Sequence, residues 1–120
     1  MLYEHITRNV KLSKSFLTKE EDVRLPNGKV VRMGVVLFGP EQGLARNINV
    51  SILDNNNEIV KPLDYRFAEK TAGGNFLDGF MPVDFEGSKN YQARLTTTEV
   101  DNVNDVTAQF IFIVEKPNQY

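Results

Sequence analysis

The sequence contains no cysteine, no tryptophan and a single histidine, His5. Without cysteine the chain can form neither a disulfide framework nor a thiolate zinc site, and one histidine cannot build a histidine-rich metal site alone. His5 also has no cysteine or serine-containing elbow that it could activate as a nucleophile. We therefore expect no metal, no cofactor and no enzymatic activity, and a fold that is stabilised by packing alone.

An excess of one charge and long apolar runs are also missing. The chain carries 14 basic and 16 acidic side chains mixed along its length, with a net charge of −2. No basic stripe is present that would neutralise phosphates, so nucleic acid is not an expected partner. No run approaches the ~20 apolar residues of a membrane span, and the amino terminus lacks the order of a secretion signal. We expect a chain that is made in a cytoplasm and has no membrane partner.

What is present is a series of short alternating segments separated by turn residues. The length of 120 residues corresponds to one ordinary domain, residues 1–120. About seven or eight alternating segments recur along it at intervals of about ten residues. This pattern predicts an all-β fold, an antiparallel β-sandwich of immunoglobulin-like or jelly-roll type.

The clearest alternation runs from Asn90 to Glu115 and predicts one long β-hairpin. Asp101 to Asp105 would form its loop, because Asn and Asp bond to nearby backbone groups. The second arm is apolar along one face, and its other face becomes apolar at Ile111 and Ile113. A strand of this kind is expected at the centre of a sheet, covered on both sides. Two residues on its apolar face are predicted to be core residues, Phe110 and Phe112.

Shorter signals predict the remaining strands. Asn27-Gly28 lies between apolar segments and predicts a hairpin, and Asp54 to Asn57 predicts a second hairpin with a slightly longer loop. The segment from Lys29 to Phe38 is apolar on both faces, which indicates a strand deep in the sandwich. Pro62 to Lys70 fits either a strand, which we prefer, or two helical turns. Pro82 places its segment at a sheet edge or at a crossing between sheets.

The first seventeen residues are the least regular part of the pattern. They mix large apolar side chains with Lys and Arg without a clean period, so we interpret residues 1–17 as an N-terminal arm or an edge strand. A short helix that opens at Thr18, with Glu21 at capping-box spacing, is an alternative, but Pro26 follows soon after. Apolar area left on a small domain marks an interaction site, although an ordinary first strand fits this sequence equally well. The expected partner-binding residues are Leu2, Tyr3, Ile6, Val10 and Leu12.

The remaining candidates for a catalytic or metal-binding site are the acidic side chains. A glycosidase needs two carboxylates that face each other across a cleft. Asp84 with Glu86 and Asp101 with Asp105 are the best pairs, yet each lies in a predicted turn of an acid-rich chain. The segment from Asp101 to Asp105 also offers oxygen ligands for calcium, but it lacks the glycine and the distant Glu of the helix-loop-helix site. We interpret all four carboxylates as solvated loop charges.

Carbohydrate binding is served by flat aromatic platforms, for which this chain offers Tyr and Phe alone. Most Phe residues fall at inward positions, where core packing accounts for them. Tyr3, Tyr65 and Tyr120 are expected to be the exposed rings, and they are scattered along the sequence. Asn49-Val50-Ser51 matches the glycosylation pattern, but it lies inside a predicted strand.

As a whole, the chain resembles the small β-sandwich virion proteins of tailed bacteriophages, the capsid decoration or auxiliary proteins. The features that carry the resemblance are the size, the absence of cysteine and of an export signal, Asn- and Thr-rich strands such as Tyr91 to Thr98, and the closing strand from Ala108 to Val114.

The resemblance implies a non-enzymatic protein that is made in the host cytoplasm and assembled into the virion. It would bind other virion proteins, above all the major capsid protein, and stabilise the shell, often as a symmetric homo-oligomer. The alternative is a carbohydrate- or receptor-binding β-sandwich module, and the third hypothesis is a small glycan hydrolase.

Overall fold

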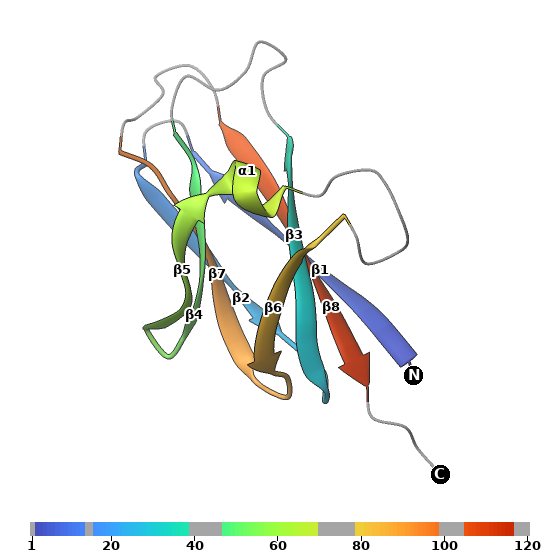
Figure 1. The fold of residues 1–120 in the computed structure, drawn as a ribbon. Coiled ribbons are helices and arrows are strands. Elements are labelled where there is room, and N and C mark those ends of the chain that lie inside the picture. The colour runs from blue at the N-terminus through green and yellow to red at the C-terminus, as the bar shows by residue number, and fades with distance from the viewer. Residues whose placement is uncertain (1, 14–15, 39–46, 70–78, 99–104, 117–120) are drawn as a thin grey trace.

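Eight β-strands and one helical turn make up the regular structure of the described residues. The structure is a computed structural model, and it describes residues 2–13, 16–38, 47–69, 79–98 and 105–116. The prediction of an all-β fold is confirmed (Figure 1). In chain order the elements are β1 (Leu2–Leu12), β2 (Thr18–Arg24), β3 (Lys29–Phe38), β4 (Asn49–Asp54), β5 (Asn57–Asp64), α1 (Tyr65–Ala68), β6 (Met81–Glu86), β7 (Asn90–Thr96) and β8 (Val106–Lys116).

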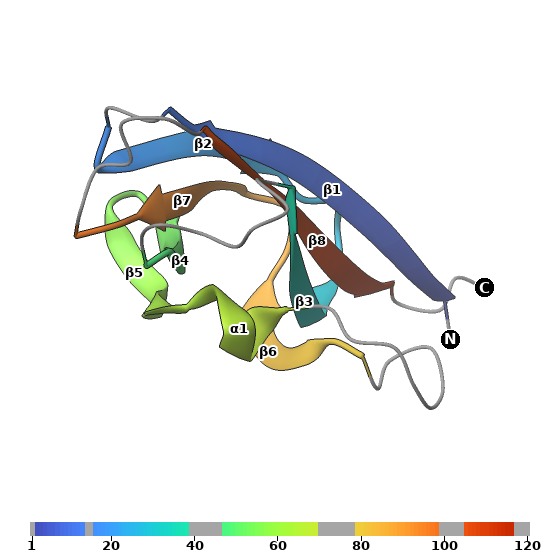
Figure 2. The ribbon, with the colours of Figure 1, turned by 90° about the horizontal axis from the view of Figure 1, so that it is seen from above.

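The strands pair in a nested order, as if one long hairpin were folded over on itself. Strand β1 pairs with β8, β2 with β7, β3 with β6 and β4 with β5, all antiparallel. Further pairing of β3 with β8 and of β4 with β7 completes two four-stranded sheets, β1-β8-β3-β6 and β2-β7-β4-β5. The two sheets lie against each other as layers (Figure 2). Of the two predicted types of sandwich, this topology is that of a jelly roll.

The predicted hairpin from Asn90 to Glu115 is wrong, because its two arms belong to different sheets. Strand β7 lies between β2 and β4, whereas β8 lies between β1 and β3. The apolar faces of the two strands meet across the core: Tyr91 and Leu95 of β7 and Phe110 and Phe112 of β8 are all buried in one cluster. Alternation identified both strands and their inward faces, but it carries no information about whether two strands pair or face each other.

The predicted hairpin at Asn27-Gly28 is also wrong, because β2 and β3 lie in opposite sheets. A two-residue hairpin loop of this type needs positive φ at both positions. Gly28 has φ of +139°, but Asn27 is not among the residues with positive φ. The segment therefore crosses from one sheet to the other instead of turning back.

This crossing is held against a second crossing, the connection between β6 and β7. The Gly87 N–H donates to the carbonyl of Gly28 at 2.8 Å, and the Leu25 N–H donates to the carbonyl of Lys89 at 3.0 Å. The Ser88 hydroxyl donates to the side-chain oxygen of Asn27 at 3.1 Å. The two connections thus close one end of the sandwich as a single hydrogen-bonded unit.

The predicted hairpin from Asp54 to Asn57 is confirmed, and its loop is shorter than expected. Asp54 pairs directly with Asn57, which leaves Asn55 and Asn56 as a two-residue loop. Their φ values of 51° and 70° are those of a type I′ turn, whose twist matches the flanking strands.

The core contains the residues predicted for the closing strand, since Phe110 and Phe112 are fully buried with nearly parallel rings 6.3 Å apart. Strand β8 occupies a central position, as expected, and Ile113 on its other face is also buried. A shift in register between Val30 and Arg32 interrupts the alternation of β3. The extra residue of such a bulge re-aims the chain, so Val30 is fully buried together with Met33 and Val35.

The segment from Pro62 to Lys70 begins as the preferred strand but leaves it at residue 65. Strand β5 ends at Asp64, and α1 follows as a single turn. The Asp64 carboxylate accepts bonds from the backbone N–H and the guanidinium of Arg66, each at 2.9 Å. These bonds lower the pKa of Asp64 to about 2. The alternative helix at Thr18 is wrong because β2 begins there, and β6, which contains Pro82, is an edge strand as expected.

Gly87→Ala should destabilise the protein by about 2 kcal/mol or more, because the added methyl group would overlap the carbonyl oxygen of Pro26. Urea denaturation would measure the change. Ser88→Ala is the matched control, since it removes one exposed hydrogen bond and should cost less than about 1 kcal/mol. Equal stability of the two variants would contradict the tight approach of the two connections.

Phe110→Ala should lower the free energy of unfolding by about 3–5 kcal/mol, because it removes buried area and leaves a cavity. That loss is comparable with the whole stability of a small domain. Ile59→Ala on β5, where the side chain is 38% exposed, should cost far less. Thermal melting checks both variants, and an unchanged melting temperature for Phe110→Ala would contradict the inward assignment.

Candidate interaction surface

The predicted partner-binding residues fall on an edge strand of the domain itself. Residues Leu2 to Leu12 form β1, which pairs with β8 along its whole length. Val10 and Leu12 are fully buried in the core, and Ile6 packs against it. In this fold these two buried side chains are not available to a partner, whereas Tyr3 is 41% exposed.

The most exposed large apolar side chains of the described residues are Phe16 and Leu17, in the connection between β1 and β2. Their exposed fractions are 60% and 49%. We call these two residues the Phe16–Leu17 pair. The connection leaves β1 at Leu12, at the end of the sandwich opposite the crossings at Gly28 and Gly87.

Backbone hydrogen bonds fix the position of the Phe16–Leu17 pair. The Phe16 N–H donates to the carbonyl of Ser13 at 3.0 Å, and the carbonyl of Leu17 accepts from Thr97 N–H at 2.9 Å. The second bond continues the pairing of β2 with β7 one step beyond Thr18 and Thr96. The two apolar side chains are therefore presented from an anchored backbone, which lowers the entropy lost when a partner binds.

Next to the pair lies an open depression lined by polar side chains, those of Thr18, Lys19, Glu20 and Arg94. Arg94 on β7 donates to the carboxylate of Glu20 on β2 at 3.1 Å. These charges neutralise each other, so the surroundings of the pair carry polar groups without a strong field of one sign.

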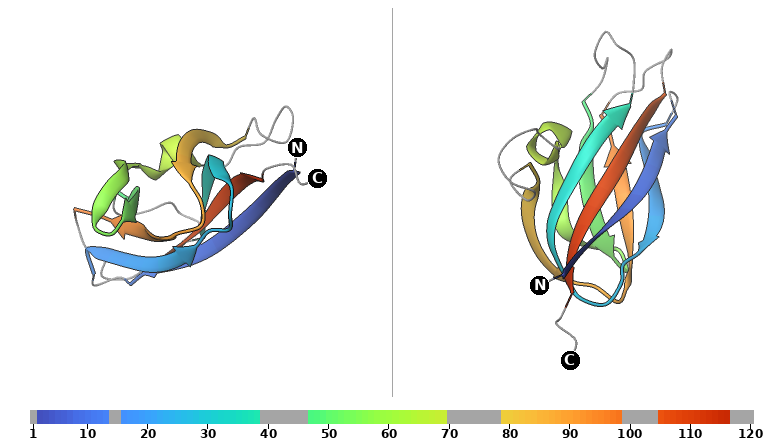
Figure 3. Two further views of the ribbon diagram at one scale, coloured as in Figure 1. Left: turned by 90° about the horizontal axis from the view of Figure 1, so that it is seen from below. Right: turned by 90° about the vertical axis from the view of Figure 1, so that its right-hand side faces the viewer.

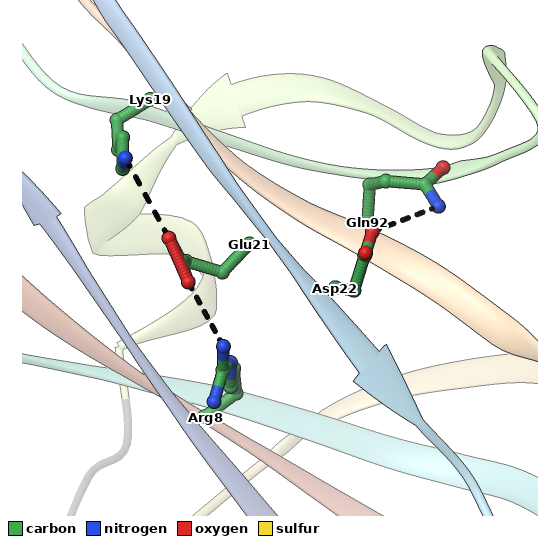
Figure 4. A network of polar contacts seen from close by, with 5 residues as sticks. All are labelled: Arg8, Lys19, Glu21, Asp22 and Gln92. Carbon is green, nitrogen blue, oxygen red and sulfur yellow. Dashed lines mark hydrogen bonds and ion pairs between the residues drawn. The ribbon is translucent and has the colours of Figure 1, made fainter.

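A further charge network joins the two sheets (Figure 4). Arg8 on β1 donates to Glu21 on β2 at 2.9 Å, and Lys19 lies 3.6 Å from the same carboxylate. Arg8 and Glu21 share strand faces with the buried Val10 and Val23, so both point toward the space between the sheets. The edge strands β1 and β2 thus meet through an ion pair at one side of the sandwich (Figure 3).

The candidate catalytic carboxylates Asp84 and Glu86 lie two residues apart on the exposed face of strand β6, instead of in the predicted turn, and thus do not face each other across a cleft. Asp84 lies on an edge strand with 76% of its side chain exposed, and it pairs with Lys29 at 3.0 Å. This contact raises the pKa of Lys29. Asp105 pairs with Lys11 at 3.5 Å, while Asp101 lies outside the described residues. In the described ranges, no three acidic or His side chains gather in a way that could hold a metal ion.

The other residues considered as candidate sites lie at separate places in the fold. His5 is exposed on β1, and the Tyr65 ring lies under the guanidinium of Arg66, 5.8 Å away. Asn49 and Ser51 lie within β4, and Ser51 is fully buried. Tyr120 lies outside the described residues. None of the helical residues in the described part of the chain forms a stretch that could cross a membrane.

The Phe16–Leu17 pair was not among the expected partner-binding residues, although the sequence carries a signal for it. Phe16 and Leu17 come directly before β2, and adjacent residues of an extended chain point to opposite faces, so these two large apolar side chains cannot both turn inward. At least one of them must remain outside unless another layer covers it.

Comparison with known proteins adds no relative. No protein-family model matches the chain, no curated protein matches it, and no solved structure matches it.

A double-mutant cycle of Arg8→Ala and Glu21→Ala should give a coupling energy of about 0.2–1 kcal/mol, because both side chains are partly exposed. The coupling should shrink in about 1 M salt, where charges are screened over roughly 3 Å. Denaturant unfolding of the four proteins at low and high salt measures it. A coupling that salt leaves unchanged would contradict an electrostatic contact.

Proposed function

We propose that this chain is a non-enzymatic interaction protein, a structural component of a bacteriophage virion that binds the capsid shell and stabilises it. The single observation that carries the proposal is the Phe16–Leu17 pair, exposed at one end of the sandwich on an anchored backbone. The major capsid protein is the proposed partner, and the chain would reach it in the host cytoplasm during assembly.

The physical argument begins with the cost of leaving such side chains in water. Burying a Phe or Leu side chain contributes roughly 1.5–3 kcal/mol relative to exposure. Aromatic side chains at the centre of protein interfaces supply a large share of binding energy, and the surrounding polar groups form the rim. The Phe16–Leu17 pair, with Arg94 and Glu20 beside it, has this composition.

Two further observations support a virion component. One is the resemblance in size and composition to capsid decoration proteins, and the other is the jelly-roll topology, an architecture that viral capsid and lectin domains use. Topology supports the proposal by analogy alone, because one fold serves many functions.

The experiment uses shells assembled from the major capsid protein encoded in the same genome. The purified chain should sediment with the shells, and Phe16→Ser/Leu17→Ser should reduce binding at least tenfold, since both anchors are lost. The double variant should remain folded, because both side chains are exposed. Ile59→Ser is the matched control, because it removes an exposed apolar side chain from β5 and should leave binding unchanged.

The outcomes separate the surface from the function. If the native chain binds shells and the double variant binds equally well, the Phe16–Leu17 pair is not the contact. If the native chain does not bind shells, the virion function is lost. Binding of the native chain to a glycan array would then favour a carbohydrate- or receptor-binding module.

A further inference from the structure

The free edge of β1 is the longest of the four sheet edges of the sandwich. Strand β5 contains Pro62 and shifts its register twice against β4, and β6 is a six-residue strand that contains Pro82. Such features blunt an edge against pairing. Strand β2 lacks proline and keeps its register with β7, but it has seven residues. Strand β1 has eleven residues, lacks proline and keeps an unbroken register with β8.

A second strand could therefore continue the sheet at β1. On one side β1 pairs with β8, and none of the described strands pairs with its other side. Strand β2 lies next to β1, but it belongs to the opposite sheet and pairs with β7. The N–H and C=O groups along the free edge of β1 are a template for an added strand.

The side chains of β1 that point toward the inner face have an order that is complementary to itself. They are Glu4, Ile6, Arg8 and Val10, in the order acidic, apolar, basic, apolar, on the face that Val10 shares with the core. We propose that β1 pairs antiparallel with β1 of a second copy of this chain, about a two-fold axis at Ile6, to form one continuous eight-stranded sheet. This proposal is independent of shell binding.

The register follows from charge complementarity. With Ile6 opposite Ile6, Glu4 of each copy lies opposite Arg8 of the other, and Leu2 lies opposite Val10. A shift by one pair in one direction would set Glu4 against Ile6 and Leu2 against Arg8. A shift in the other direction would set Ile6 against Arg8 and Glu4 against Val10. Directly opposite unlike charges stabilise a strand pair, so the register centred on Ile6 is the favoured one.

Both charges remain accessible in the single chain. Glu4 pairs with Lys116 at 3.2 Å and is 35% exposed, and Arg8 pairs with Glu21 and is 45% exposed. A guanidinium has several N–H donors and can bond two carboxylates at once. The intermolecular pairs can therefore form without breaking the pairs within each copy.

Sedimentation equilibrium of the full chain tests the proposal through a charge swap. The native chain should dimerise, and Glu4→Arg or Arg8→Glu alone should raise the dimer dissociation constant about tenfold or more, because like charges then face each other twice. The double variant E4R/R8E should restore dimerisation. Within each copy that double variant faces like charges at both Lys116 and Glu21, so restoration can come only from contacts between copies.

A cysteine scan gives a second measurement that does not depend on the charge variants folding equally well. The chain has no cysteine, so Ile6→Cys introduces one thiol, placed opposite itself across the axis. Oxidation should give a disulfide-linked dimer, since directly opposite Cβ atoms lie near disulfide distance. Thr7→Cys is the control, because its two copies would be roughly 8 Å apart, beyond disulfide reach.

A native chain that stays monomeric at high concentration overturns the proposal. So does a dimer that both single charge variants leave unchanged, or a double variant weaker than either single one. Equal cross-linking of Ile6→Cys and Thr7→Cys would exclude the proposed register.

Discussion

The pairing of β8 with β1 on one side and β3 on the other is the interaction on which the remaining structure depends. It joins the first strand, the third and the last in one sheet, and it sets the inner faces of Phe110 and Phe112 against β7 of the opposite sheet. Once β1 and β8 are paired, the following strands nest inside them, down to the Asn55–Asn56 turn. Because these contacts are distant in sequence, folding must close large loops before they contribute.

The nested order also decides what the two ends of the sandwich contain. At one end, two crossings pack so closely that Gly87 has no room for a side chain, and Gly28 likewise lies tightly against Glu115 at the end of β8. At the other end, the connection between β1 and β2 exposes Phe16 and Leu17 from a hydrogen-bonded backbone. One end is thus specialised for closure of the fold, whereas the other presents apolar surface, which is why the proposed shell contact lies there.

The two open sides of the sandwich also differ in the side chains that line them. Between β5 and β6 the inward side chains are apolar and α1 lies close by, with Tyr65 packed against the core. Between β1 and β2 the edge strands meet through Arg8 and Glu21. Charges on the inner face of an edge strand still allow it to pair with another strand, but only with one whose charged side chains are in a complementary order. That restriction is the basis for a specific rather than an indiscriminate contact at β1.

Local pattern alone determined which segments are strands and which side chains face the core, as at Phe110, Phe112 and the Asp54–Asn57 turn, because period and turn chemistry are properties of neighbouring residues. The tertiary structure decided which strands pair, since β7 and β8 are close in sequence but face each other across the core. It also decided that Asn27-Gly28 crosses between sheets, that a bulge turns Val30 inward, and that α1 replaces the end of a predicted strand. Finally, it moved the candidate interaction surface from Val10 and Leu12 to Phe16 and Leu17, because exposure depends on the layer that covers a side chain, and that layer is distant in sequence.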